Sequence, residues 1–263
     1  LESGSGTMLG GTGNDSMSAY MATVSMDGGD GNDIVDGENG TYTIGGGIGD
    51  DTLYGVAFIG SMDGGSGNDL LYGEEGDKVT MQGGSGDDFL QGVGGSYDMR
   101  GDEGQDTLVG DTGNDTLEGG SGNDYLDGGD GNDQLSESSG QNTLHGGLGN
   151  DLLDVTGGTN LMTGGDGEDT LSGYAAVATM TGGAGNDVLD GGFGTYTMSG
   201  EAGEDTLYGS SMSGSMSGGV GGDLLYVQDG TGAIMSGDED DDLIVLESGS
   251  GTMLGGTGND SMS

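Results

Sequence analysis

The chain lacks several residue types on which common folds depend. It has 263 residues, with no cysteine, no proline and a single histidine. The absence of cysteine excludes disulfides, zinc–thiolate sites and thiol catalysis, and it is compatible with an exported bacterial protein. No apolar run approaches the ~20 residues of a membrane span. No basic segment followed by an apolar one opens the chain, so we expect any export signal to lie outside this sequence.

Positive charge is almost absent as well. Lys78 and Arg100 stand against 47 acidic residues, which gives a formal net charge of −45. Binding to nucleic acid or to an anionic membrane needs basic surface, so we expect neither partner and no membrane insertion. A polyanion of this kind repels itself, and its folding therefore requires counter-cations.

Apolar and aromatic residues are also few. They make up 30% and 5% of the chain, while 69 residues are glycine. So little apolar material cannot fill a thick, multilayered core, and this glycine content without proline departs from the composition of ordinary globular domains. The composition favours a thin core that is repeated along the chain.

What the chain does contain is a short repeat. Gly-Gly-x-Gly-Asn-Asp occupies residues 10–15, and the related hexads begin at 28, 46, 64, 83, 101, 110, 119, 128, 146, 164, 182, 200, 218, 237 and 255. Their spacing is nine or eighteen residues, or nineteen in the two places where one residue is inserted. Twenty-nine nonads account for residues 1–263, with single insertions near 73–82 and 227–236. We therefore expect one continuous repeat domain without a linker.

The eighth position of each nonad is apolar throughout. It forms two ranks, Met8, Met26, Ile44, Met62, Met81, Met99, Leu117, Leu135, Leu153, Leu171, Leu189, Leu207, Leu225, Ile244 and Met262, and Met17, Val35, Leu53, Leu71, Leu90, Leu108, Leu126, Leu144, Met162, Met180, Met198, Met216, Met235 and Met253. Side chains alternate faces along a strand, so this position points inward. The pattern predicts an all-β, parallel β-roll or β-solenoid with two three-residue strands and two turns per 18-residue coil. Methionine fills space where the turns are degenerate; a metal or redox role for it is the alternative.

The turns have the chemistry of a hard-cation site. Glycine at positions one, two and four permits left-handed backbone angles that direct carbonyl groups toward one point. Aspartate at position six adds a carboxylate. Oxygen ligands without His or Cys select calcium, which accepts six to eight ligands, over magnesium, which requires a stricter octahedron.

These turns resemble the RTX (repeat-in-toxin) family, whose motif is Gly-Gly-x-Gly-x-Asp-x-apolar-x. Residues 119–127, GGSGNDYLD, and 182–190, GGAGNDVLD, match it fully. The resemblance implies a right-handed roll with calcium between successive turns of one edge, up to about fourteen ions in all, held by turn carbonyls and position-six aspartates. The implied metal ligands are Asp15, Asp33, Asp51, Asp69, Asp88, Asp106 and Asp124 on one edge, and Asp115, Asp133, Asp151, Asp169, Asp187, Asp205, Asp223, Asp242 and Asp260 on the other.

Several turns depart from this motif. Gly222 stands where Asn or Asp is usual, the hexad 237–242 is GDEDDD, and the hexads 101–106 and 200–205 lack the second glycine. We expect less well defined sites there. The intervening turns, such as 19–24 and 173–178, lack the aspartate, and we expect no calcium in them. Calcium turns are predicted on one edge over 10–127 and on the other over 110–263.

The first eighteen residues recur at the other end of the sequence. Residues 1–18 and 246–263 are identical and lie 245 residues, or twenty-seven nonads, apart. We interpret the chain as a segment of a longer tandem array or surface filament; an engineered duplication is the alternative. Neither end carries a polar cap, so we expect self-association end to end or continuation of the same chain.

No catalytic constellation is present in the sequence. His145 lies beside a strand residue without a matching Ser or Cys, so we expect no enzyme. The pattern indicates an extracellular, calcium-binding structural or adhesive rod at a bacterial cell surface. One alternative is ice binding through outward Thr and Ser ranks, which Ile234, Asp98, Arg100 and Leu161 interrupt; the ranks comprise Thr179, Thr181, Thr197, Ser199, Ser215 and Ser217. The other is the repeat domain of an exported RTX toxin or protease.

Overall fold

A computed structural model describes the backbone of residues 1–263 and every side chain except that of Asp77. The secondary structure of this described chain is β-strand without helix. No helix of the described residues is long and apolar enough to cross a membrane. Two compact units are present, Leu1–Asp130 and Gly131–Ser263, and each is described by itself below. The single continuous domain expected from the sequence stays a prediction.

The first unit contains twelve strands. They are β1 (Gly4–Thr12), β2 (Ser16–Tyr20), β3 (Ala22–Asp30), β4 (Ile34–Glu38), β5 (Thr41–Ile48), β6 (Thr52–Val56), β7 (Ile59–Ser66), β8 (Leu70–Ser85), β9 (Phe89–Glu103), β10 (Thr107–Val109), β11 (Thr116–Ser121) and β12 (Tyr125–Asp130).

The second unit contains thirteen strands. They are β13 (Gln134–Glu137), β14 (Gln141–Leu148), β15 (Leu152–Val155), β16 (Thr159–Asp166), β17 (Thr170–Gly173), β18 (Val177–Ala184), β19 (Val188–Ala202), β20 (Thr206–Val220), β21 (Leu224–Val227), β22 (Gly230–Glu239), β23 (Leu243–Leu246), β24 (Gly249–Thr257) and β25 (Ser261–Met262). Most strands in both units are longer than the three residues predicted, because pairing extends into the turns.

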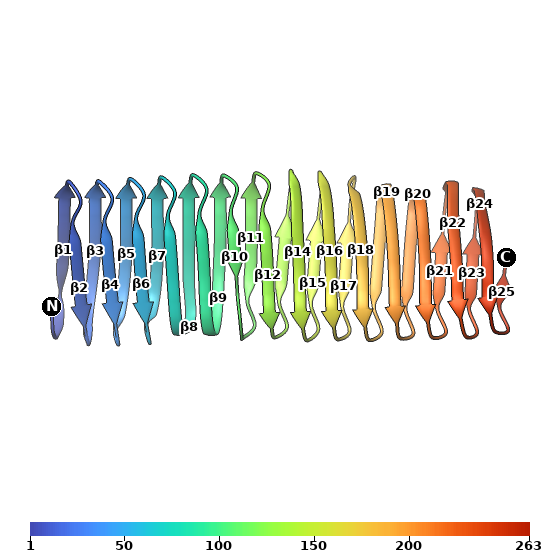
Figure 1. Cartoon of the computed structure of the whole chain (residues 1–263), viewed down its shortest axis with the longest axis horizontal. Coiled ribbons are helices and arrows are strands. Elements are labelled where there is room, and N and C mark those ends of the chain that lie inside the picture. The colour runs from blue at the N-terminus through green and yellow to red at the C-terminus, as the bar shows by residue number, and fades with distance from the viewer. The chain divides into compact units, whose positions relative to one another are not determined.

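Strands in each unit pair in parallel with the strand one coil away, as Figure 1 shows. Met8 of β1 pairs with Met26 of β3, and Leu153 of β15 pairs with Leu171 of β17, both 18 residues on. The two inserted residues are absorbed as register shifts between Asp77 and Val79 and between Thr231 and Ala233. The parallel β-roll predicted from the nonad period is confirmed.

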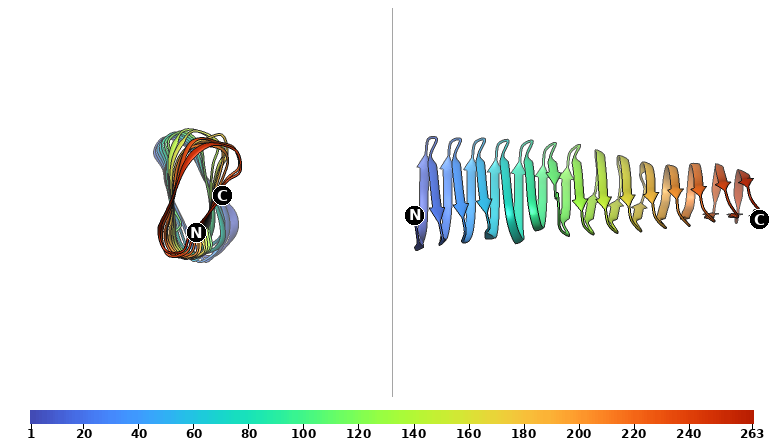
Figure 2. Two further views of the ribbon diagram at one scale, coloured as in Figure 1. Left: turned by 90° about the vertical axis from the view of Figure 1, so that its right-hand side faces the viewer. Right: turned by 60° about the horizontal axis from the view of Figure 1, so that its bottom comes forward.

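The core of each unit is the pair of apolar ladders. Each coil is a flattened loop when viewed along the stack (Figure 2, left), and the position-eight side chains lie inside it. They are buried in every coil except at the two ends of the sequence, where Met8 and Met253 are half-buried and Met262 is 49% exposed. The thin, repeated core expected from the composition is therefore present.

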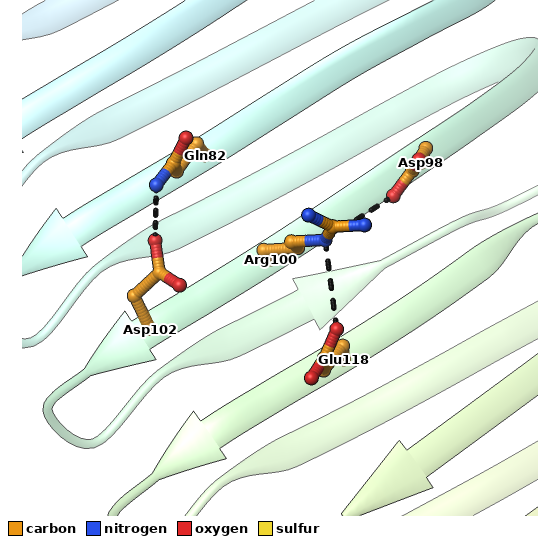
Figure 3. A network of polar contacts seen from close by, with 5 residues as sticks. All are labelled: Gln82, Asp98, Arg100, Asp102 and Glu118. Atoms are coloured by element: carbon orange, nitrogen blue, oxygen red, sulfur yellow. Dashed lines mark hydrogen bonds and ion pairs between the residues drawn. The ribbon is translucent and has the colours of Figure 1, made fainter.

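The outer surface carries little ion pairing. Arg100 Nε lies 3.7 Å from Asp98 Oδ1 and 3.5 Å from Glu118 Oε2, and the Gln82 side-chain amide donates to Asp102 Oδ2 at 2.6 Å (Figure 3). All three members of the ion-pair network are about half exposed, and such pairs contribute about 1 kcal/mol or less. Stability must come from the ladders and the turns.

Truncating one ladder residue tests the contribution of the core. Leu171 is fully buried between Leu153 and Leu189 of the neighbouring coils. We expect Leu171→Ala to lower the free energy of unfolding in calcium-containing buffer by about 2–5 kcal/mol, since it removes buried methyl groups and leaves a cavity. Leu161→Ala, at a 46% exposed site, is the matched control. If both changes lowered the urea midpoint equally, the claim that the buried ladder stabilises the fold would be wrong.

Candidate metal centre

The position-six aspartates stack in register inside the turns of each unit. One carboxylate oxygen, Oδ1, accepts a hydrogen bond from the backbone N–H of the aspartate one coil earlier: Asp33 N donates to Asp51 Oδ1 at 2.7 Å, and Asp169 N donates to Asp187 Oδ1 at 2.8 Å. Six such bonds join Asp15 to Asp124 in the first unit, and seven join Asp133 to Asp260 in the second.

The structure thus places the predicted ligands of each unit on common ladders. Asp15, Asp33, Asp51, Asp69, Asp88, Asp106 and Asp124 form one ladder of the first unit, and Asp133, Asp151, Asp169, Asp187, Asp205, Asp223, Asp242 and Asp260 form the ladder of the second. Asp115 lies elsewhere in the first unit, where its Oδ1 accepts from Tyr97 N at 2.7 Å. That these residues bind metal stays a prediction.

The second carboxylate oxygen, Oδ2, is the unusual feature of these ladders. In Asp33, Asp51 and Asp69 of the first unit, and in Asp169 and Asp187 of the second, Oδ2 is buried and has no hydrogen-bond donor. The side chains are only 1–3% exposed. A buried acceptor without a donor costs about 1–3 kcal/mol, and more when it is charged. Repeated in successive coils, this cost calls for a cation.

Glycine at the first turn position makes room for that oxygen. A Cβ on Gly28 would overlap Asp33 Oδ2, and one on Gly164 would overlap Asp169 Oδ2. Any other residue there would displace the carboxylate. The first glycine of the motif is therefore required by the aspartate five residues later.

The other turn glycines form a cradle of carbonyl oxygens. Gly29 and Gly31 have φ of 105° and 132°, which is backbone that side chains disfavour. A Cβ on Gly29 would overlap the Gly11 carbonyl oxygen, and one on Gly31 would meet that of Gly13, one coil earlier. Carbonyl and carboxylate oxygens consequently gather in each turn, and oxygen donors of this kind suit calcium.

Side chains alone do not form the site. Within the part of the chain that the structure describes, no group of three or more His, Cys, Asp or Glu side chains is arranged to hold a metal ion. A cation at these turns would be held by carboxylates of adjacent coils together with backbone carbonyl oxygens and water. Calcium accepts such a mixed set because its geometry is flexible.

The turns that depart from the motif keep its backbone path. Asp102, Glu201 and Asp238 occupy the second position with φ of 74°, 77° and 80°, where a side chain costs roughly 1–2 kcal/mol. Asp111 does the same with φ of 66°, a departure that the sequence reading did not single out. Whether calcium binds less well there stays a prediction.

A second ladder runs along the outside of the same turns at position five. Asn32 N donates to Asn14 Oδ1 at 3.0 Å, and Asn150 N donates to Asn132 Oδ1 at 2.8 Å. At position five, each backbone N–H therefore donates to the side chain of the preceding coil. At position six, it donates to the carboxylate of the following coil. Gly222 stands at position five, where Asn or Asp is usual, and it has no side chain to continue the position-five ladder.

Burial raises the pKa of several inner carboxylates. It is the largest cause for Asp69 and Asp106, whose pKa rises to about 7. The pKa of Asp169 and Asp223 also rises to about 7, and that of Asp187 to about 6. Neighbouring carboxylates on the ladder raise each value further, and the backbone N–H donor lowers it. Without a cation, the fold disfavours the ionised ladder.

Turns without the aspartate are filled by side chains instead. Position six holds Val24, Tyr42 and Val79 in the first unit, all 3% exposed or less. Where position six is Gly60, Phe58 from position four is buried in its place. Turn 19–24, expected from the sequence to lack calcium, is one of these filled turns.

The second unit fills its turns in the same way. Ala178, Tyr196 and Ala233 occupy position six, and Met212 is buried beside Gly214. Turn 173–178, also expected to lack calcium, contains Ala178. We did not recognise these filling residues from the sequence; apolar side chains recurring at position six of the degenerate nonads are the signal that could have found them.

Tyrosine and asparagine side chains satisfy carbonyl groups in these filled turns. Tyr42 Oη donates to Glu38 O at 2.7 Å, and Tyr196 Oη donates to Gly173 O at 2.9 Å. Asn160 Nδ2 donates to Gly157 O at 2.7 Å. An uncharged donor therefore takes the role that a cation would have in the aspartate turns.

Acidification tests the pKa shifts. The pKa of these carboxylates is higher in the folded chain than the value of about 3.9 in the unfolded chain. Their contribution to folding stability is therefore fully present at a pH below about 3.9, where they are protonated, and it is lost as the pH rises through the folded pKa. The calcium-free chain should therefore gain β-structure as the pH falls from 7.5 through about 6–7 toward 4.5. Circular dichroism in EDTA measures this; a signal that stays flat or weakens on acidification contradicts it.

Comparison with known protein families agrees with this geometry. The family model of the RTX calcium-binding nonapeptide repeat (4 copies) matches residues 25–44, 54–77, 80–96, 100–135, 138–171 and 179–198. No curated protein matches the chain. The matched segments cover more than half of the sequence and include turns of both units, so the chain belongs to the RTX calcium-binding nonapeptide repeat family.

Proposed function

We propose that the chain is an extracellular structural or adhesive repeat protein of a bacterial cell surface, folded by calcium bound between successive aspartate turns. RTX nonapeptide repeats bind calcium, and the RTX repeat β-solenoid is a structural repeat fold. The observation that carries the proposal is the buried Oδ2 without a donor, which recurs in Asp33, Asp51 and Asp69 of the first unit and in Asp169, Asp187 and Asp205 of the second. A divalent cation between coils supplies what each of these oxygens lacks.

The ladders set how many ions the units could take. Consecutive aspartates enclose six gaps in the first unit and seven in the second. One calcium per gap would bring 26 positive charges against the formal net charge of −45. The remaining predicted gap, between Asp115 and Asp133, joins residues of different units and stays a prediction.

An extracellular location follows from the affinity expected of such turns. Each ion would share two carboxylates and otherwise meet neutral carbonyl oxygens, and sites with few charged ligands bind calcium at the roughly 10⁻⁴–10⁻³ M typical of extracellular modules. RTX repeats are typical of secreted proteins. The chain would stay unfolded where calcium is scarce and fold on export, because binding free energy becomes folding free energy.

The repeated end segment supports an assembled role. Residues 246–263 are identical to residues 1–18, and β1 and β24 share the same strand sequence and the same pattern of exposure. A further coil, from the same chain or from another copy, would cover either strand. We therefore propose continuation of the array or end-to-end self-association.

Calcium removal and one charge-neutral change test the proposal. In EDTA at pH 7.5 the β-structure should be lost, and calcium should restore it. Asp169→Asn should reduce bound calcium by about two ions per chain, since one aspartate lines two gaps; the amide still fits, as Asn160 shows at position six. The exposed Asp166→Asn in the same turn is the control. Isothermal titration that gives equal stoichiometry for both variants would overturn the assignment.

Ice binding is a second candidate, which the strand register favours. Thr163, Thr181, Ser199, Ser217 and Ser236 pair in an unbroken rank on the outside of the second unit. The first unit has a similar rank, Thr7, Ser25, Thr43, Ser61 and Thr80. Regular hydroxyl ranks offer repeated hydrogen bonds to ordered water.

Thermal hysteresis of the calcium-loaded chain decides this candidate. If the ranks bind ice, the freezing point should lie below the melting point. Thr181→Lys places a bulky, charged side chain in the rank and should abolish this difference, whereas Thr170→Lys, on the outer face of the other sheet, should leave the difference unchanged. Freezing and melting points that coincide for the unmodified chain would eliminate ice binding.

A further inference from the structure

The residue at position five, directly before each inner aspartate, is acidic in some coils and uncharged in others. Along the ladder of the first unit these residues are Asn14, Asn32, Asp50, Asn68, Asp87, Gln105 and Asn123. Along the ladder of the second unit they are Asn132, Asn150, Glu168, Asn186, Glu204, Gly222, Asp241 and Asn259. No two of the acids stand in adjacent coils of a ladder. The outer negative charges of each ladder are therefore separated by at least one uncharged coil.

The side chain at position five reaches toward the following coil. Asn68 N donates to Asp50 Oδ1 at 2.9 Å in the first unit, and Asn259 N donates to Asp241 Oδ1 at 2.7 Å in the second. The donor in each pair stands directly before the inner aspartate of its own coil, as Asn68 stands before Asp69. A side chain at position five therefore lies beside the gap between the inner aspartate of its own coil and that of the next.

The inner carboxylates respond to the outer acids beside them. Burial is the largest cause of the raised pKa of Asp51 and Asp69, and the nearby charge of Asp50 raises the pKa of both further. Burial likewise raises the pKa of Asp187 in the second unit, and Glu168 of the preceding coil adds to this rise. A charge that acts on both sides of a gap lies beside that gap, in agreement with the hydrogen bonds.

The gap between Asp51 and Asp69 consequently contains more carboxylates than its neighbour. Oδ2 of Asp51 and of Asp69 is buried without a donor, and these side chains are 1% and 3% exposed. Asp50 adds a third carboxylate on the solvent side, where it is exposed. The gap between Asp33 and Asp51 has the uncharged Asn32 in the corresponding place. A cation would face three carboxylates in the first gap and two in the second.

The number of charged ligands is one of the features that set the calcium affinity of a site built from oxygen atoms. An additional carboxylate attracts a divalent ion by Coulomb's law, and at an exposed position this attraction is reduced by water and salt. We propose that the position-five acids divide the calcium gaps into a tighter and a weaker class, so that the gaps beside an acid fill first and empty last. This inference rests on the proposed function, because it ranks the sites at which calcium is proposed to bind.

The tighter gaps would divide the inner aspartates into separate pairs. These gaps are Asp51–Asp69 and Asp88–Asp106 in the first unit, and Asp169–Asp187, Asp205–Asp223 and Asp242–Asp260 in the second. No aspartate belongs to two of them. One divalent ion in each tighter gap would balance the charge of the two carboxylates that line it. Calcium at a higher concentration would then enter the weaker gaps between the pairs.

Anomalous diffraction from crystals of the calcium-loaded full chain measures the occupancy of each gap separately. The crystals are washed in solutions of decreasing free calcium at constant ionic strength. In the unmodified chain, the gap Asp51–Asp69 should lose half of its calcium at a free concentration about three- to tenfold lower than the gap Asp33–Asp51 does. The second gap serves as the reference within the same crystal.

Exchanging Asp and Asn at position five tests the cause of this difference. Asp50→Asn should remove the difference, and Asn68→Asp should make the next gap, Asp69–Asp88, retain calcium as the tighter gaps do. Both residue types already occur at position five, and both have the Oδ1 that accepts the outer hydrogen bond, so the variants should fold. Glu75→Gln removes the same charge from an exposed residue on the other edge of the unit. This control should leave the difference unchanged.

Two results would overturn the inference. The gaps Asp51–Asp69 and Asp33–Asp51 of the unmodified chain could empty at the same calcium concentration. Alternatively, the gap Asp51–Asp69 could remain the tighter one in Asp50→Asn, which would assign the difference to something other than the outer acid. Failure of the proposed function would look different, because no aspartate gap would then show an anomalous peak even in saturating calcium.

Discussion

The stacking of buried carboxylates at coil spacing is the constraint on which the rest of the structure depends. One oxygen of each inner aspartate is fixed by the backbone of the preceding coil, and this bond sets the register. In residues such as Asp51 and Asp169, the other oxygen is buried without a donor. Like charges a few ångströms apart in a medium of low dielectric cannot all remain ionised. The folded charge arrangement is therefore unfavourable unless a cation completes it. The glycines at positions one, two and four leave space for the carboxylate and for the carbonyl oxygens of the adjacent coil.

The same fold also contains turns that need no cation. Tyr42, Tyr196 and the residues related to them fill the turn and donate to its carbonyl groups. Within each unit, one edge thus rests on aspartates and the other largely on packed side chains. A spacing of 154 residues relates Tyr42 to Tyr196, Phe58 to Met212 and Asp51 to Asp205. The two kinds of edge consequently recur together in the two units.

Much of this architecture is predictable from the sequence because period and chemistry are both local. A nonad with an apolar eighth residue specifies two inward ladders, and Leu171 and Met81 lie where that pattern puts them. The residues that fill the other turns are harder to foresee. Val24, Tyr42 and Asn160 share a position but no chemical type, and Phe58 replaces the missing side chain of Gly60 from two residues away. Such compensation depends on the volume of a closed turn, which a linear pattern does not contain. The positive φ of Asp111 was missed because the flanking residues of that hexad fit the motif.

The central claim is that calcium occupies the aspartate turns and is absent from the filled ones. Anomalous diffraction from crystals of the chain grown with calcium, recorded at long wavelength, tests it most directly. The account predicts peaks between successive inner aspartates, such as Asp51 and Asp69 or Asp169 and Asp187, and none in the turns of Tyr42 and Tyr196. Peaks in the turns filled by tyrosine, or aspartate turns without a peak, would contradict it.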